Sequence, residues 1–126
     1  NGVTRLADTL SHLSQQIIRV PVELILVDNA SSDGAKHFAD EWWKQHGNPK
    51  IHYKSFEQPL PGKSYAQEMG YSNSSYEYWL VCDDDNWLTP HYVQTAYQIM
   101  NTNDQIGALG GWCEAVFENE KPEWFD

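Results

Sequence analysis

The stretch EYWLVCDDDN, residues 77–86, decides the fold expected for this chain. Its first six residues are mostly apolar, with aromatic and β-branched members. A run of that length, bounded by a polar turn, predicts a strand buried on both faces of a sheet. Three successive carboxylates, Asp83, Asp84 and Asp85, follow at the carboxyl end of this strand, where α/β proteins place their ligand sites.

The three carboxylates predict a cation site. Like charges this close repel one another and raise one another's pKa values, so the cluster is costly unless a positive group occupies it. Hard divalent ions such as Mg²⁺ and Mn²⁺ prefer oxygen ligands, which makes one of them the simplest occupant. A solvated acidic turn is the alternative, and the apolar run that leads into the acids argues against it.

Hydrophobic periodicity predicts that helices and strands alternate along the chain. The expected elements, in order, are a helix over residues 4–19, a strand over 22–27, a helix over 35–46, an edge strand over 51–56, a helix over 63–71, the strand over 77–82, a helix from Pro90 onward and a strand over 106–111. Alternation implies an α/β fold with a mostly parallel β-sheet flanked by helices on both faces. A helix comes first, so the strand expected before it is missing. Residues 1–126 are therefore expected to form a single domain that is a fragment of a larger one.

Composition limits the function. The net charge of −10 argues against nucleic acid and anionic membrane surfaces as partners, and no apolar run approaches the length of a membrane span. Cys82 and Cys113 lack C-x-x-C spacing and each ends an apolar run. We interpret both as reduced core thiols in a cytoplasmic protein. The five histidines are dispersed, and none is assigned to a metal.

Two further residues are candidates for ligand binding. Asp28 ends the predicted strand over residues 22–27, and its carboxylate could accept charge-assisted hydrogen bonds from a nucleobase or ribose. The alternative is an Asp that caps the following turn. Lys63 follows Pro-Gly at a predicted helix start, a position that attracts anions, although a solvated surface lysine fits the spacing equally well.

Four segments resemble, in order and spacing, the family 2 glycosyltransferases with the GT-A fold. They are VELILVDNASSDG (22–34), GKSYAQEMG (62–70), YWLVCDDDNWLTP (78–90) and IGALGG (106–111), and they cover nearly the whole chain. The resemblance implies a Rossmann-like domain that takes part in polysaccharide biosynthesis. It also implies metal-dependent transfer of a sugar from a nucleotide-diphosphate sugar to an acceptor hydroxyl, with inversion, and this fragment would carry the donor-binding half.

The resemblance also implies residue roles. Asp28 falls where the family contacts the base, and Asp83 and Asp85 fall on its D-x-D motif, the first near the ribose and the second on the metal. Glu68 departs from the pattern, because the family commonly has Asn there. The residues expected to bind the nucleotide sugar are Asn1, Asp28, Asn29, Lys63, Asp83 and Asp84, and those expected to bind Mn²⁺ or Mg²⁺ are Asp85 and Asp83.

The catalytic base and the acceptor site of the family lie well beyond its D-x-D motif, so the base is expected beyond Asp126. The acids of the C-terminal part are interpreted as a solvated segment; they are Glu114, Glu118, Glu120, Glu123 and Asp126. The expected partners are a nucleotide-sugar donor and a saccharide or lipid-linked acceptor. Any attachment to the inner face of a membrane would come from segments outside this chain.

Two other functions fit some of the residues. A phosphohydrolase with an apolar strand followed by D-x-D-x-T/V would use Asp83 as its nucleophile, but Trp87 stands where Thr or Val is expected. A non-catalytic nucleotide-binding module is the other alternative, because no catalytic base can be named.

Overall fold

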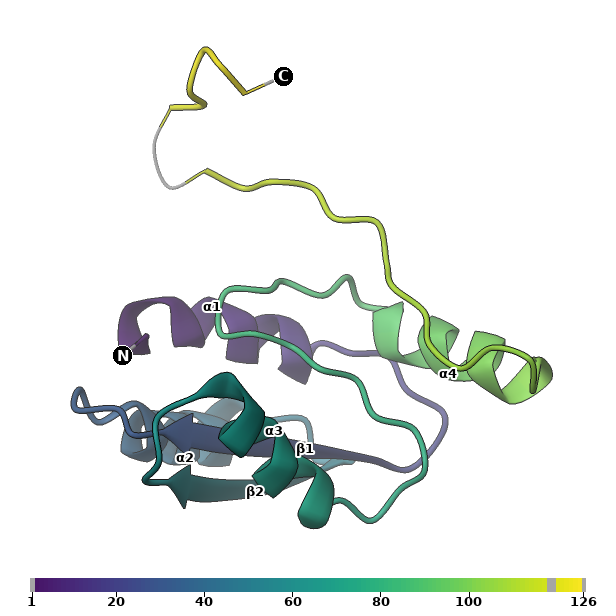
Figure 1. Ribbon diagram of the computed structural model, residues 1–126, viewed down its shortest axis with the longest axis horizontal. Coiled ribbons are helices and arrows are strands. Elements are labelled where there is room, and N and C mark those ends of the chain that lie inside the picture. The colour runs from purple at the N-terminus through teal and green to yellow at the C-terminus, as the bar shows by residue number, and fades with distance from the viewer. Residues whose placement is uncertain (1, 118–119, 126) are drawn as a thin grey trace.

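The computed structural model describes residues 2–117 and 120–125 (Figure 1). Its elements are α1 (Val3–Ser14), β1 (Val22–Asn29), α2 (Ala35–His46), β2 (Ile51–Gln58), α3 (Lys63–Ser72) and α4 (Tyr92–Thr102). The alternation of helix and strand from α1 to α3 confirms the predicted α/β class. Within residues 2–117 and 120–125, no helix is both long and apolar enough to cross a membrane.

β1 and β2 form a parallel two-stranded sheet, with Val22 opposite Ile51 and Asn29 opposite Gln58. Because successive side chains of a strand point to opposite faces, the register divides each strand into two sets. Leu24 and its partner Tyr53 pack toward the core, whereas residues 23 and 54 point to the other face.

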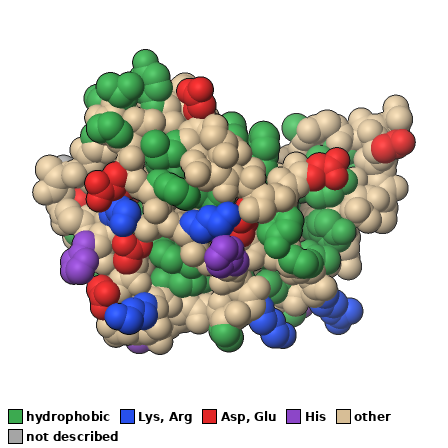
Figure 2. All heavy atoms as spheres, turned by 90° about the horizontal axis from the view of Figure 1, so that it is seen from below, with side chains coloured by type: hydrophobic (Ala, Val, Ile, Leu, Met, Phe, Trp, Pro, Cys, Tyr) green, Lys and Arg blue, Asp and Glu red, His purple; other side chains and the backbone are tan. Residues whose placement is uncertain are grey.

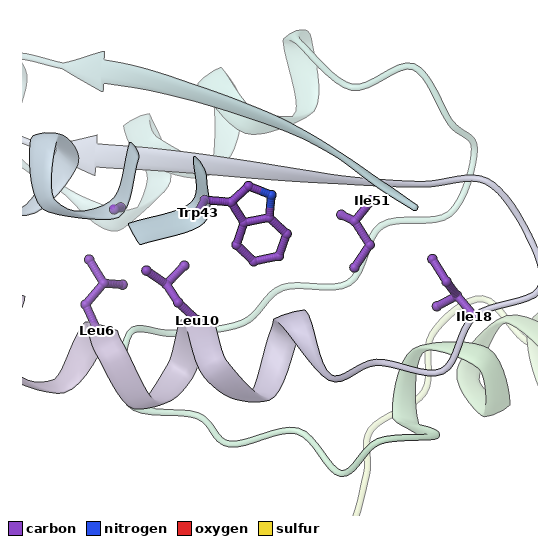
Figure 3. Close-up of a cluster of buried hydrophobic side chains, with 6 residues drawn as sticks. Leu6, Leu10, Ile18, Trp43 and Ile51 are labelled. Atoms are coloured by element: carbon purple, nitrogen blue, oxygen red, sulfur yellow. The ribbon is translucent and has the colours of Figure 1, made fainter. Parts of the chain in front are cut away.

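Helices cover both faces of this sheet. α2 lies behind the strands in Figure 1 and α1 packs against α2, while α3 lies in front of the strands. The core is formed where the apolar stripe of α1 meets α2 and β2 (Figure 3). Its buried members are Leu6, Leu10, Ile18, Ala39, Trp43 and Ile51. Trp43 also stacks on Tyr53, with 5.4 Å between the ring centroids. Leu6, Leu10 and Leu13, at steps of four and three residues, form the core face of α1, whereas Ile17, the next residue at this spacing, lies past the helix and is 49% exposed.

An ion pair fastens the other face of the sheet to the loop that follows α3. Lys54 Nζ lies 2.7 Å from Oε2 of Glu23, whose side chain is only 7% exposed. The other oxygen of Glu23 accepts a hydrogen bond from the backbone N–H of Ser75, and Lys54 also donates to Ser75 Oγ. Burial alone would raise the pKa of Glu23, but these hydrogen bonds and the charge of Lys54 together lower it.

The prediction of a buried strand over residues 77–82 is wrong for this structure. The run is irregular and pairs with no strand, and its apolar side chains are exposed, with Trp79 at 56% and Val81 at 50%. A strand requires a hydrogen-bonding neighbour, and among the residues that the structure describes β1 and β2 pair only with each other.

Other expectations differ in detail. Residues 106–111 form no strand either, and they continue into an extended tail that leads away from the sheet (Figure 1). The first helix ends at Ser14 rather than near residue 19, and the last begins at Tyr92 rather than at Pro90.

Cys113 is exposed, so it is not the core thiol that the sequence suggested, whereas Cys82 is partly buried. On the face seen in Figure 2, hydrophobic side chains reach the surface in several groups between the charged ones.

Candidate functional site

The three carboxylates of residues 83–85 lie beside two cations. Lys63 Nζ, at the start of α3, is 2.9 Å from both carboxylate oxygens of Asp83. Arg5 of α1 lies 3.2 Å from Asp84 and 3.9 Å from Asp85. The acidic side chains are about half exposed. The cations relieve the repulsion within the trio, but two of them face three carboxylates, so the site remains acidic.

Hydrogen bonds hold this group at the carboxyl edge of the sheet. The Asp33 carboxylate, just past β1, accepts from the backbone N–H groups of Gly2 and Val3 at 2.8 and 3.2 Å, which fixes the start of α1 there. Asn29, the last residue of β1, accepts from the Gly62 N–H at 2.6 Å, which fixes the start of α3. The acids therefore occupy the edge at which α/β proteins bind ligands.

A polar stripe of α1, which continues just past the helix end, holds the segment that contains and follows the acids. Its members recur at steps of four, three and four residues, and they are Arg5, Thr9, His12 and Gln16. Arg5 contacts the carboxylate of Asp84, and the Thr9 hydroxyl donates to the Asp84 backbone carbonyl at 2.8 Å. A Cβ at Gly2 would overlap the Asp84 carboxylate as it lies here, so any other residue at this position would require that side chain to shift.

The rest of the stripe binds residues 87–89. The His12 ring stacks on Trp87, with 5.6 Å between centroids, and its Nδ1 lies 3.2 Å from the carbonyl oxygen of Leu88. Gln16, which is buried, donates from Nε2 to the carbonyl of Thr89 at 2.8 Å. α1 thus has two functions in the fold, since one stripe forms the core and the other positions the acidic stretch.

Charges within the group shift two pKa values. The hydrogen bond and charge of Asp83, with a further contribution from Asp85, raise the pKa of Lys63, so its ammonium stays protonated. Burial, together with the charges of Asp83 and Asp85, raises the pKa of the Cys82 thiol to about 11. A thiol with that pKa is a poor nucleophile near neutral pH, so Cys82 is an inert neighbour of the site.

Other predicted site residues already have structural partners. Oδ1 of Asp28 accepts from the N–H of Ser31 at 3.2 Å, which is the turn-capping role named above as its alternative. The amide of Asn29 donates to the carbonyl of Leu60 at 2.6 Å while its oxygen accepts from Gly62, so Asn29 braces the loop before α3. The predicted site residue Asn1 lies outside the described residues, as do two of the C-terminal acids, Glu118 and Asp126.

No group of three or more His, Cys, Asp or Glu side chains is placed to hold a metal ion within residues 2–117 and 120–125. The carboxylates are nonetheless oxygen ligands of the kind that Mg²⁺ and Mn²⁺ take, and they lie within one tripeptide. A Mg²⁺ site that also uses substrate phosphates requires only one or two carboxylates from the protein, so the residues present fit such an ion.

Sequence reasoning missed Arg5, Thr9 and Asp33, although a signal existed for the first two. Arg5 and Thr9 belong to a second stripe at helical spacing, which could have been recognised as a polar helix face that needs a partner. Asp33 carried no comparable signal, because its partner N–H groups belong to a helix start that is distant in the sequence.

The Asp33 contact predicts a pH dependence. The hydrogen bond from Val3 N–H lowers the pKa of Asp33 most, and desolvation opposes it, but the further hydrogen bonds from Ala35 and Gly2 keep the pKa below its ordinary value. A depressed pKa means that the contact stabilises the fold above the pKa of the unfolded chain, about 3.9, and that this contribution is lost as the pH falls through the folded value. We expect a carboxyl carbon titration by NMR to give Asp33 a midpoint below that of an aspartate in the unfolded chain. An equal or higher midpoint would contradict the contact.

Comparison with known proteins identifies the family. The model of the family described as "Glycosyl transferase family 2" matches residues 1–124. Glycosyltransferase GlyG of Streptococcus pneumoniae serotype 4 is 24% identical over 107 residues, which is 85% of this chain and 34% of that protein. The chain thus spans about a third of this relative, and no solved structure matches it. Because the family model covers almost every residue, this chain belongs to glycosyl transferase family 2.

Proposed function

We propose that this chain forms the donor-binding part of a metal-dependent glycosyltransferase. The protein would transfer a sugar from a nucleoside diphosphate sugar to an acceptor hydroxyl, with inversion at the anomeric carbon. The observation that carries the proposal is the group of half-exposed carboxylates at the carboxyl edge of the sheet, with Lys63 and Arg5 beside them. Family membership supports the same function.

The contacts support a different proposed role for each carboxylate. Lys63 bonds both oxygens of Asp83, whereas the nearest cation to Asp85 is Arg5 at 3.9 Å. Asp85 is therefore the carboxylate we assign to Mn²⁺ or Mg²⁺, with Asp83 as a second ligand, while Asp84 supports the donor through Arg5. When bound, the ion would act as a Lewis acid that neutralises charge on the diphosphate leaving group.

The remaining donor contacts would come from groups at the same edge. Lys63 lies at the start of α3, where its ammonium and the free N–H groups of the first helical turn favour a phosphate. Asp28 would accept hydrogen bonds from the base or ribose through its carboxylate, whose Oδ1 also accepts from Ser31 N–H. Asn29, which lies at the same edge, is proposed to support the donor, and Asn1 is proposed as a donor contact on the family resemblance alone.

The acceptor and the catalytic base are proposed to belong to the longer protein rather than to residues 1–126. We propose a saccharide or lipid-linked acceptor, a cytoplasmic site of action in polysaccharide biosynthesis, and a carboxylate base supplied by the longer protein. A base must lie within hydrogen-bond reach of the acceptor hydroxyl that it deprotonates. The described acids of the tail, Glu114, Glu120 and Glu123, lie in the extended C-terminal segment, away from the acidic stretch (Figure 1).

Calorimetric titration of UDP and GDP, with and without Mn²⁺, tests donor binding. We expect Mn²⁺ to strengthen the binding of one nucleotide, and Asp85→Asn to weaken that metal-dependent binding by at least about tenfold, because it removes a charged metal ligand. Asp104→Asn is the matched control, since it removes the same charge from an exposed turn after α4.

Three outcomes would count against the proposal. They are metal-independent binding, equal losses in Asp85→Asn and Asp104→Asn, or no binding by a protein whose circular dichroism shows it to be folded. Release of phosphate from p-nitrophenyl phosphate, lost on Asp83→Asn, would instead favour the phosphohydrolase.

A further inference from the structure

Arg5 of α1 lies between two carboxylates that are adjacent in the sequence. Its Nη2 is 3.2 Å from Oδ2 of Asp84, and its Nη1 is 3.9 Å from Oδ2 of Asp85. Asp85 is the carboxylate assigned above to the divalent ion. The guanidinium of Arg5 therefore lies against the group that would hold this ion.

The contact contributes little to the stability of the fold. The side chains of Arg5, Asp84 and Asp85 are between 45% and 53% exposed, and ion pairs with that exposure are weak. The backbone of the acidic stretch has an anchor of its own, because the Thr9 hydroxyl donates to the Asp84 carbonyl at 2.8 Å. The Arg5 side chain can therefore change its partner while the acidic stretch stays in place.

The position of Arg5 within α1 is unfavourable for a helix. α1 begins at Val3, so Arg5 belongs to the first turn, and this turn contains no acidic residue. The N-terminal end of a helix carries a partial positive charge, which disfavours a cation there. Residues that break a local rule without stabilising the fold are expected at functional sites. The position of Arg5 therefore favours a role in the site over a role in the helix.

Arg5 should affect the ion and a diphosphate in opposite directions. An ion bound to Asp85 would lie close to the guanidinium, and like charges at short distance repel each other. A diphosphate has the opposite charge, and a guanidinium binds its oxygens through two parallel N–H groups. Arg5 should therefore oppose binding of the ion alone and favour binding of the ion together with a diphosphate.

We propose that Arg5 couples the binding of the divalent ion to the binding of the diphosphate. Arg5 pairs with Asp84 and Asp85 until a nucleotide binds, and it then donates to the diphosphate. The ion is consequently held firmly only together with the nucleotide. This inference rests on the proposed function, because it takes Asp85 as a metal ligand and a nucleoside diphosphate as part of the donor.

Titration with Mn²⁺, followed by electron paramagnetic resonance of the free ion, tests the coupling on the whole chain. The dissociation constant for Mn²⁺ is measured without nucleotide, with saturating UDP and with saturating GDP. We expect Arg5→Met to bind Mn²⁺ alone about fivefold more tightly, because a positive charge next to the ion is removed. The factor by which the nucleotide strengthens Mn²⁺ binding should fall by at least about fivefold, and linkage requires the same fall in the effect of Mn²⁺ on nucleotide binding.

Three further variants separate this role from general effects of charge. Arg5→Gln is a second neutral variant and should behave like Arg5→Met. Arg5→Lys keeps the charge without the planar fork, so it should retain weak binding of Mn²⁺ alone and restore part of the coupling. Arg19→Met is the matched control, because it removes the same charge from an exposed position between α1 and β1. It should leave both quantities as they are in the unsubstituted protein.

Several results would overturn the coupling. They are equal or weaker binding of Mn²⁺ alone by the two neutral variants when circular dichroism shows them to be folded, an unchanged effect of the nucleotide in these variants, and equal changes in Arg19→Met. Each of them differs from a failure of the proposed function. In that case neither UDP nor GDP changes the affinity of the unsubstituted protein for Mn²⁺, and the proposed function and the coupling are both wrong.

Discussion

Replacing Lys54 with methionine is expected to lower the free energy of unfolding by about 3 kcal/mol near neutral pH, because it leaves a buried carboxylate without its cation. The side chain of Glu23 is 7% exposed and lies 2.7 Å from Lys54 Nζ. Methionine retains most of the length of the lysine stem, so the main change is the loss of charge and hydrogen bonds. Urea denaturation followed by circular dichroism measures the difference.

The effect of Lys54→Met should depend on pH in a definite direction. In the native protein the pKa of Glu23 is lowered, so the pair stabilises the fold above the unfolded pKa, about 4.3, and this contribution disappears as the pH falls through the folded value. In the variant, burial acts without the lysine and favours the protonated acid. We therefore expect the stability difference between the two proteins to narrow below about pH 4.

Two controls separate the buried charge from a general effect of losing a lysine. Lys44→Met removes a lysine that is 75% exposed and only 3.8 Å from Glu41, so its effect should stay within about 0.5 kcal/mol. Adding Glu23→Gln to Lys54→Met should restore part of the lost stability, because no buried charge remains. A double variant less stable than Lys54→Met, or a Lys44 effect of equal size, would contradict this account.

Replacing Leu10 with alanine is expected to destabilise the fold by about 2–5 kcal/mol, because it leaves a cavity where α1 meets α2. Leu10 is the largest fully buried side chain in the described residues, at 1% exposure, and it packs within the cluster that includes Leu6 and Trp43 (Figure 3). Small domains have only about 5–15 kcal/mol of stability in total, so the variant should unfold at a much lower urea concentration.

Ile99→Ala provides the comparison for Leu10→Ala. Ile99 lies on α4 and is 43% exposed, so truncation should cost less than about 1 kcal/mol. The loss at Leu10 should also weaken nucleotide binding indirectly, because α1 carries Arg5 and Thr9 to the acidic stretch. Equal losses at Leu10 and Ile99 would show that the interface between α1 and α2 is not the main core.

The sequence predicted the elements whose signals are local. The apolar period of α1 and the bounds of α2 follow from side chains on one helix face, and the strands β1 and β2 follow from compact runs of strand-forming residues closed by turn residues. For the site, the sequence predicted the acidic stretch and Lys63 as an anion-binding candidate, because charge and position along the chain are visible without coordinates; the pairing of Lys63 with Asp83 was not predicted.

The sequence could not predict which segments that are distant along the chain pair with one another. The run over residues 77–82 has the composition of a buried strand, yet in this structure it has no strand neighbour and stays exposed. Composition reports what a segment would bury, whereas strand formation depends on whether another backbone lies within hydrogen-bond distance. The segment 106–111 failed as a strand for the same reason.

By itself, the amino-acid sequence determined the α/β alternation, the core stripe of α1 and the presence of three adjacent carboxylates after an apolar run. Only the tertiary structure decided which groups meet those carboxylates, namely Arg5 and Lys63 from two helix starts, and which residues are already engaged, such as Asn29. The physical reason is the separation along the chain over which each kind of interaction acts. Periodicity and turn propensity act over a few residues, but the charges and hydrogen bonds of the site join residues brought together only when the helices pack on the sheet.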